Sequence, residues 1–242
     1  MHHSRFGPAG PAALVFRSAL LCLAALLCFA PAARADEIAI WNFNDSNLAA
    51  DYGSGTLTTN MVAANVGFST PGSAVNARMG DPAGLSLALQ NGTGGANNGA
   101  HLTFSVSTAG FSNIIVSFAT QRTSTGFSSN QFQYSLDGVT FVDFGPAFMP
   151  PASFGLVSFD LSSIPGLNDN PLAAFRIVFN GGSTTSGTGN NRIDNLVVEG
   201  VVTAANTPVP EPATLTLLGS GIFGLAAAGR RRRKRRHSAA RP

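Results

Sequence analysis

The sequence predicts an all-β fold, a jelly-roll-like β-sandwich, placed between two apolar segments at the ends of the chain. Alternating apolar and polar residues recur through the middle of the sequence, Gly- and Asn-rich stretches separate these runs, and no long segment there has a helical period. We therefore divide the chain into a leader at 1–35, a sandwich ectodomain at 36–202, a linker at 203–208 and a C-terminal segment at 209–236.

The leader, residues 1–35, has the pattern of a secretory signal peptide with its short helix. Basic residues precede an apolar run of 12 residues at 19–30, and Ala33 and Ala35 then place small residues before a cleavage point at Asp36. Both cysteines lie inside the apolar run, so the mature chain would have no thiol chemistry. The alternative is an uncleaved anchor, for which the run is short.

The middle of the chain alternates with a period of two, which is typical of strands with one polar face. Asp137-Gly138, between two such runs, is a hairpin signal. The stretches 91–99 and 180–191 have the composition of loops. Nine strands are predicted, near 37–43, 85–89, 101–107, 114–118, 131–136, 139–144, 154–160, 175–179 and 192–199.

The charge is distributed unevenly. Residues 36–207 contain 11 acidic and four basic residues, a net charge of −7, whereas residues 230–236 are all basic. An acidic domain repels phosphate backbones, so we expect no nucleic-acid partner for it. The high isoelectric point of the chain therefore describes its tail.

The middle of the chain carries no recognisable catalytic motif. His101 is its only histidine and falls on a polar strand face, which indicates an exposed side chain with no local support for a catalytic triad. Paired carboxylates of the glycosidase kind remain an alternative, since Asp137, Asp143, Asp160 and Asp194 could converge. We predict a non-enzymatic domain, with no cofactor.

Few aromatic residues could stack on a sugar ring. Trp41 lies in the first predicted strand and Tyr134 shares a strand face with Phe132. Large aromatic side chains dominate protein cores, so we expect both to pack inside, with ligand binding as the alternative for Trp41. The Gly/Asn/Thr loops could also offer amide and hydroxyl groups to a sugar.

Asp194 is the most informative carboxylate, because it shares the strand parity of the apolar residues after it. A buried carboxylate needs a partner. We favour a salt bridge to Arg192 or Arg176. The alternative is a structural calcium site that Asp194 would share with Asn44 or Asp45, since calcium takes six to eight oxygen ligands.

The C-terminal segment has three parts. Val209, Pro210, Glu211 and Pro212 come first, and each proline favours an extended residue before it. Residues 213–229 then lack charge and predict a short transmembrane helix. The positive-inside rule makes the basic tail a cytoplasmic stop. This tail consists of Arg230, Arg231, Arg232, Arg233, Lys234, Arg235 and Arg236.

An extended segment beside a membrane suits a processing enzyme, although a plain Pro-rich linker has the same composition. Val209-Pro210-Glu211-Pro212, the apolar run and the basic end, in this order, resemble the PEP-CTERM sorting signal of exported Gram-negative bacterial proteins. The resemblance implies cleavage by an exosortase and an association with exopolysaccharide and biofilm. It makes the tail a temporary anchor in the inner membrane.

A weaker resemblance concerns the ectodomain. The motifs WNFND, YSLDGVTFVDF and RIDNLVVEG resemble the jelly-roll ectodomains of PEP-CTERM proteins, which overlap in fold with galactose-binding-like carbohydrate modules. We therefore expect a chain that is exported across the inner membrane, briefly anchored and then displayed at the cell surface or in the matrix. The alternatives are a module that binds exopolysaccharide and, last, an extracellular hydrolase.

Overall fold

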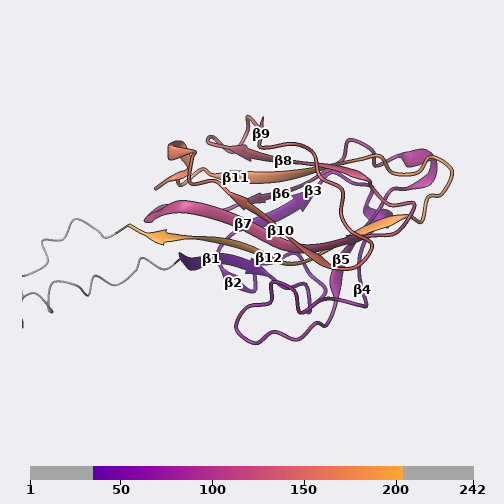
Figure 1. Ribbon diagram of the computed structural model, residues 1–242, viewed down its shortest axis with the longest axis horizontal. Helices are drawn as coiled ribbons and strands as arrows, with labels where there is room; N and C mark the ends of the chain where they lie inside the picture. The colour runs from indigo at the N-terminus through magenta and orange to yellow at the C-terminus, as the bar shows by residue number, and fades with distance from the viewer. Residues whose placement is uncertain (1–34, 204–242) are drawn as a thin grey trace, which may run out of the picture. The chain divides into compact units, whose positions relative to one another are not determined.

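The computed structural model describes residues 35–203, which form two antiparallel sheets packed face to face (Figure 1). The seven-stranded sheet contains β1 (Ala35–Trp41), β2 (Tyr52–Gly53), β4 (Val66–Ser69), β5 (Ser86–Gln90), β7 (Phe111–Arg122), β10 (Gly155–Asp160) and β12 (Asn190–Val202). The five-stranded sheet contains β3 (Thr56–Thr59), β6 (His101–Ser105), β8 (Ser129–Ser135), β9 (Val142–Asp143) and β11 (Ala174–Asn180). Three short 3₁₀ turns are η1 (Ala63–Asn65), η2 (Thr93–Gly95) and η3 (Pro165–Leu167). Within the described part, no helix is long and apolar enough for a membrane crossing.

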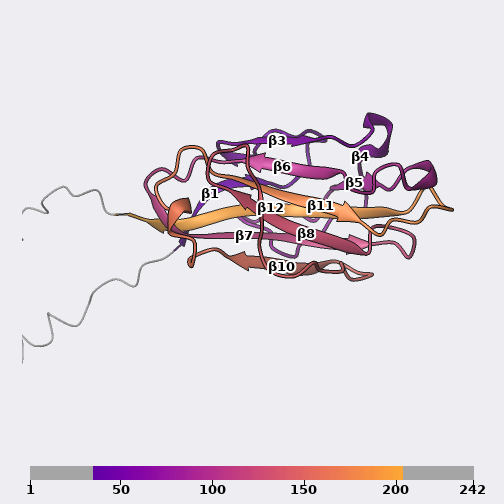
Figure 2. The same cartoon turned by 90° about the horizontal axis from the view of Figure 1, so that it is seen from above.

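The strand pairing is that of a jelly roll. Strand β1 pairs β12, β6 pairs β11, β7 pairs β10 and β8 pairs β9, so the pairs nest inside one another as in a long hairpin that has been rolled up. The four-strand orders β10-β7-β12-β1 and β6-β11-β8-β9 follow from this rolling (Figures 1 and 2). The predicted sandwich of jelly-roll type is confirmed.

All nine predicted strands are present, and three short strands were missed. Strand β2 has two residues, β3 has one buried apolar residue, Leu57, and β4 contains Gly67, so none of them shows a clear alternation. Their pairing depends instead on neighbours: β3 adds to β6 and β4 adds to β5. The predicted hairpin at Asp137-Gly138 joins β8 to β9 as expected.

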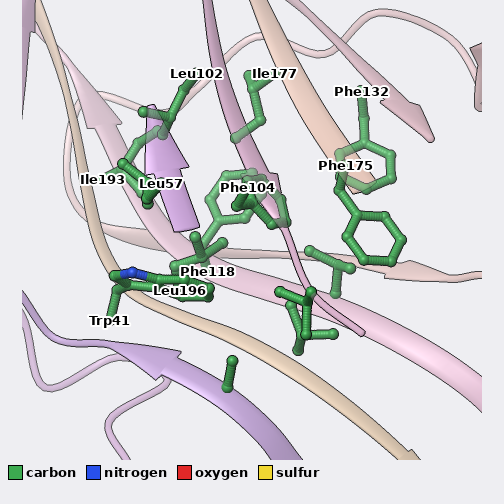
Figure 3. Close-up of a cluster of buried hydrophobic side chains, with 14 of the residues drawn as sticks. Trp41, Leu57, Leu102, Phe104, Phe118, Phe132, Phe175, Ile177, Ile193 and Leu196 are labelled. Atoms are coloured by element: carbon green, nitrogen blue, oxygen red, sulfur yellow. The ribbon is translucent and has the colours of Figure 1, made fainter. Parts of the chain in front are cut away.

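Aromatic side chains from both sheets fill the core (Figure 3). Trp41 is 0% exposed and meets Phe104 of the opposite sheet edge to face, with ring centroids 6.3 Å apart. Phe132 of β8 stacks on Phe159 of β10 at 3.9 Å. Tyr134 packs against the same cluster while remaining partly exposed. The predicted core positions of Trp41 and Tyr134 are therefore confirmed.

Strand β12 changes partner half-way along its length. Asn190 to Ile193 pair with β5, whereas Leu196 to Val201 pair with β1. Between these halves the register shifts, and Asn195 takes a left-handed φ of 48°, a conformation that asparagine tolerates. This bulge decides where the neighbouring Asp194 points.

Candidate functional site

The outer face of the five-stranded sheet carries a polar row that crosses every strand. Thr58 of β3, Thr103 of β6, Arg176 of β11, Gln133 of β8 and Asp143 of β9 lie in register, one beside the next. In the central strands β6 and β11 the residues on either side of them turn inward and are buried, as strand alternation requires, whereas Val142 of the edge strand β9 is exposed. The result is a row of hydroxyl, guanidinium, amide and carboxylate groups facing outward.

A groove of about 570 Å³ lies on the same face, at the end where β6 finishes and β11 begins. Its lining combines hydroxyl groups with small apolar surfaces. The residues are Ser54, Gly55, Thr56, Ser105, Val106, Ser107, Gly138, Pro171, Leu172 and Ala173. Thr56 and Ser105 are paired directly across β3 and β6, next to the pair formed by Thr58 and Thr103, so the groove and the polar row adjoin.

The turn after β8 forms one wall of the groove. Oδ1 of Asp137 accepts hydrogen bonds from the backbone N–H groups of Val139 (2.9 Å) and Thr140 (2.7 Å), and from the hydroxyl of Ser135. These bonds lower the pKa of Asp137 well below its usual range. Gly138 has a φ of 75°, which favours glycine. The loop conformation is thus fixed by local chemistry.

Arg176 stands at the centre of the polar row. Its Nε donates to the hydroxyl of Thr103 at 3.0 Å, and its guanidinium carbon lies 3.5 Å from the centre of the Phe141 ring. Partial burial lowers its pKa. His101 lies one row further along the face and is also partly buried, so its pKa is lowered by desolvation and then by the charge of Arg176. His101 thus lies on the polar face as predicted, but it is only partly exposed.

Carboxylates that were considered for a hydrolase have hydrogen-bond partners of their own. Asp143 accepts from Nε2 of Gln133 at 2.8 Å, and Asp160 accepts from the backbone N–H of Ser162 at 2.9 Å. The groove lining contains no titratable side chain. Within residues 35–203, no group of three His, Cys, Asp or Glu side chains is placed to hold a metal ion. This arrangement suits binding of a polar ligand rather than acid–base chemistry.

Asp194 is buried at 1% exposure, but not for the predicted reason. The core contains Ile193 and Leu196, so the bulge at Asn195 turns Asp194 to the outer face of the seven-stranded sheet. The segment from Thr70 to Leu85 covers it there, and Oδ2 accepts the backbone N–H of Ser73 at 2.6 Å. Asp194 thus anchors a loop and does not point into the sandwich.

The predicted salt bridge of Asp194 is wrong. Arg192 donates to the carbonyl oxygen of Pro71, and Arg176 lies on the other sheet. Backbone N–H groups of Ser73 and Asn195 take the place of the arginine. Desolvation outweighs these two bonds and raises the pKa of Asp194 to about 7.

The two other residues of the calcium hypothesis have partners of their own. Oδ1 of Asn44 accepts the backbone N–H of Leu85, and Asp45 accepts from the side chain of Asn47. No described contact brings either residue to Asp194, and the calcium site remains a prediction.

The predicted sorting residues lie mostly outside the described part of the chain. This holds for Val209 to Pro212, for the apolar run at 213–229, for the basic tail at 230–236, and for Ala33. Ala35 is described: it is the first residue of β1 and pairs with Val201, so the predicted cleavage point falls at the start of that strand.

Residues 208–233 match the family model of the PEP-CTERM protein-sorting motif. The chain contains a PEP-CTERM sorting motif at its C-terminal end. The motif implies export and anchoring by the C-terminus, and it begins a few residues after β12 ends at Val202. No curated protein matches the sequence.

Three solved structures are similar to parts of this chain at low sequence identity. The CBM22-1 xylan-binding domain of Paenibacillus barcinonensis Xyn10C is 11% identical, with 72% of this chain and 100% of that chain covered and a TM-score of 0.43. Domain 4 of AbnA, an arabinanase from Geobacillus stearothermophilus, is 12% identical over 70% and 95%, with a TM-score of 0.41. TmCBM61, in complex with β-1,4-galactotriose, is 8% identical over 65% and 92%, at 0.40. All three TM-scores lie below 0.5, so these similarities carry no argument about function.

Sequence reasoning missed the main features of this site. Phe141 fell within the predicted strand at 139–144, but nothing in the sequence indicated that its ring would lie over Arg176; in the structure it lies just before β9. Arg176 was visible as the single charge in its strand, and that isolation is the signal that could have been used. Thr58 belongs to a strand that was not predicted, so its place in the row depends on pairing with β6.

Proposed function

We propose that this is an exported, non-enzymatic surface or matrix protein whose C-terminal signal is cleaved by an exosortase. The sorting motif at 208–233 is the observation that carries the proposal. Proline disfavours a helical residue before it, so Pro210 and Pro212 favour an extended segment, the form in which a protease active site binds its substrate. The jelly roll would then be the displayed part, released from the inner membrane after cleavage.

Mass spectrometry of the C-terminus of the mature surface form tests this proposal. A C-terminus near Pro212 supports processing. Surface protein that still contains Arg236 would indicate a permanent anchor and contradict the proposal. Replacing Glu211 with Ala in the full chain should reduce the processed fraction. Asp169→Ala, which changes one acidic residue within the sandwich, should leave processing unchanged.

The second candidate function is binding of a polysaccharide by the five-stranded sheet. The hydroxyl-lined groove beside the polar row favours it, since sugars combine hydrogen-bonding edges with apolar ring faces and the groove offers both kinds of surface. An enzymatic role has less support, because the groove lining has no group that could transfer a proton.

Glycan binding by the full chain, purified in mild detergent, tests this second function. Ser105→Met should fill the groove and weaken binding, because Ser105 lines it. Ser158→Met makes the same change at an exposed position of β10 on the other sheet and should bind like the unmodified chain. No binding to any neutral or acidic glycan would contradict the proposed binding of a polysaccharide.

A further inference from the structure

Arg176 differs from the other arginines of the domain in what balances its charge. Arg78 forms ion pairs with Glu37 and Glu199, at 3.6 and 3.3 Å. Arg122 and Arg192 donate to backbone carbonyl groups in their own surroundings. Within residues 35–203, Arg176 has no carboxylate partner, as is also true of Arg122 and Arg192, but unlike them it donates to no backbone carbonyl group either.

The guanidinium of Arg176 is nevertheless held in one orientation. The ring of Phe141 covers one of its flat faces at 3.5 Å, and Nε is fixed by the hydroxyl of Thr103 at 3.0 Å. Stacking leaves the in-plane N–H groups uncovered, and among the described residues the two terminal nitrogens have no hydrogen-bond acceptor. A guanidinium that is held in one orientation with its two terminal nitrogens free is preorganised for bidentate binding of a carboxylate.

The surroundings of Arg176 favour a ligand that is both anionic and extended. Asp143, the one acidic residue of the row, already accepts from Gln133, which sits between it and Arg176. Five strands at a spacing of about 4.8 Å give the row a length of roughly 19 Å, enough for several sugar units. The groove lined by hydroxyl groups continues the same face.

A nucleic acid is a poor match for this face. The sandwich has a net charge of −7, and Arg176 is the only arginine or lysine among the outward residues of the five strands. One cation cannot offset repulsion of a closely spaced phosphate backbone. It can recognise a single carboxylate in a polymer whose remaining groups are hydroxyls.

We propose that the outer face of the five-stranded sheet binds an acidic polysaccharide, with a uronate carboxylate on the terminal nitrogens of Arg176 and neighbouring sugar rings along the groove. The proposal rests on the second function above and names its ligand class. Arg176 and Phe141 supply recognition of the acid, and the groove supplies affinity for the sugar.

Isothermal titration calorimetry of the full chain in mild detergent tests the proposal with three probes: a glucuronoxylan, whose uronates are spaced along an otherwise neutral chain, dextran sulfate and a neutral glucan. We expect the glucuronoxylan to bind most tightly. Arg176→Gln should weaken that binding at least tenfold, because it removes a charge-assisted bidentate contact. Arg176→Lys should also lose most of the affinity, since a lysine ammonium cannot form the bidentate contact with a carboxylate. Arg122→Gln makes the same change of charge elsewhere and should bind normally.

The outcomes separate the ligand class from the function. If Arg176→Gln binds the glucuronoxylan like the unmodified chain, or if the sulfated polymer competes equally, the inference is overturned. Binding of the neutral glucan that Ser105→Met abolishes and Arg176→Gln leaves intact would keep the second function and reject the acidic ligand. No binding to any probe rejects both. If Arg176→Gln lowers the melting temperature of the domain, Phe141→Leu tests the same contact with the arginine retained, and it should also weaken binding.

Discussion

The carboxylate of Asp194 accepts the backbone N–H of Ser73 at 2.6 Å, although 121 residues separate them in the sequence. Asn195 completes the contact, because its side-chain amide donates to the carbonyl oxygens of Ser73 and Val75 at 2.7 and 2.9 Å. Two successive residues of β12 thus hold one loop, Thr70 to Leu85, over the outer face of the seven-stranded sheet. We call these contacts of Asp194 and Asn195 with Ser73 and Val75 the clasp. The clasp lies where β12 changes partner.

The clasp should make stability depend on pH. The pKa of Asp194 is about 7 in the folded chain and 3.8 when unperturbed, so the folded state holds the proton more strongly. The free energy of unfolding should therefore fall as the pH rises from about 4 and through 7. We expect the melting temperature to drop by several degrees between pH 5 and pH 8.

Thermal melts of the full chain at a series of pH values measure this slope. Asp194→Asn should flatten it, because the amide does not titrate. Asp160→Asn is the matched control, since the pKa of Asp160 is lowered and the group does not titrate in that window. A slope that survives Asp194→Asn would contradict the assignment.

Arg78 should stabilise the pairing of β1 with β12. Glu37 and Glu199 lie directly opposite each other on these strands, and Arg78 contacts both. Like charges in this position repel, so Arg78→Met should lower the free energy of unfolding by about 1 kcal/mol, less at high salt. Urea denaturation measures the change, and adding Glu199→Gln should restore part of the loss. Equal losses with and without that second change would rule out charge repulsion as the cause.

Gly55 should be intolerant of a larger side chain. A methyl group at this position would lie 2.8 Å from the Trp41 ring and 3.1 Å from the carbonyl oxygen of Ser105, so Gly55→Ala should destabilise the domain by about 1–3 kcal/mol. Gly67→Ala is the control, because a methyl group there would have nothing within 4 Å, and we expect it to be within about 0.5 kcal/mol of the unmodified chain. Denaturant unfolding followed by Trp41 fluorescence compares the two.

Asn91 should be essential to the loops at the far end of the sandwich. Its side-chain amide donates to Thr125, Ser183 and Ser186, at 3.2, 2.8 and 2.7 Å, and the residue is 0% exposed. Asn91→Asp keeps the shape but sets a carboxylate against three carbonyl oxygens, so we expect a loss of at least about 3 kcal/mol at pH 7 that shrinks on acidification. Asn180→Asp, at the exposed end of β11, makes the same change where no hydrogen bond of the side chain is described, and it should cost little. A pH-independent loss for Asn91→Asp would contradict this account.

The sequence predicted those features that depend on residues close together in the chain. The nine alternating strands, the turn at Asp137-Gly138 and the core position of Trp41 follow from patterns that span a few residues, because strand periodicity and turn chemistry are local. The sorting motif is equally local: its three parts stand in order in one stretch of chain, 209–236, and the family model matches 208–233, which overlaps all three parts.

Tertiary structure alone decided the partners of Asp194 and Arg176. A bulge at Asn195 reversed the side on which Asp194 lies, and strand parity cannot reveal a bulge. Arg176 meets Phe141 because the turn after β8 brings the aromatic ring over β11, a contact between residues 35 positions apart. The sequence by itself determined the strands and the sorting signal, since these depend on neighbouring residues. Pairing between distant segments determined the binding face and the clasp, since it sets which side chains meet.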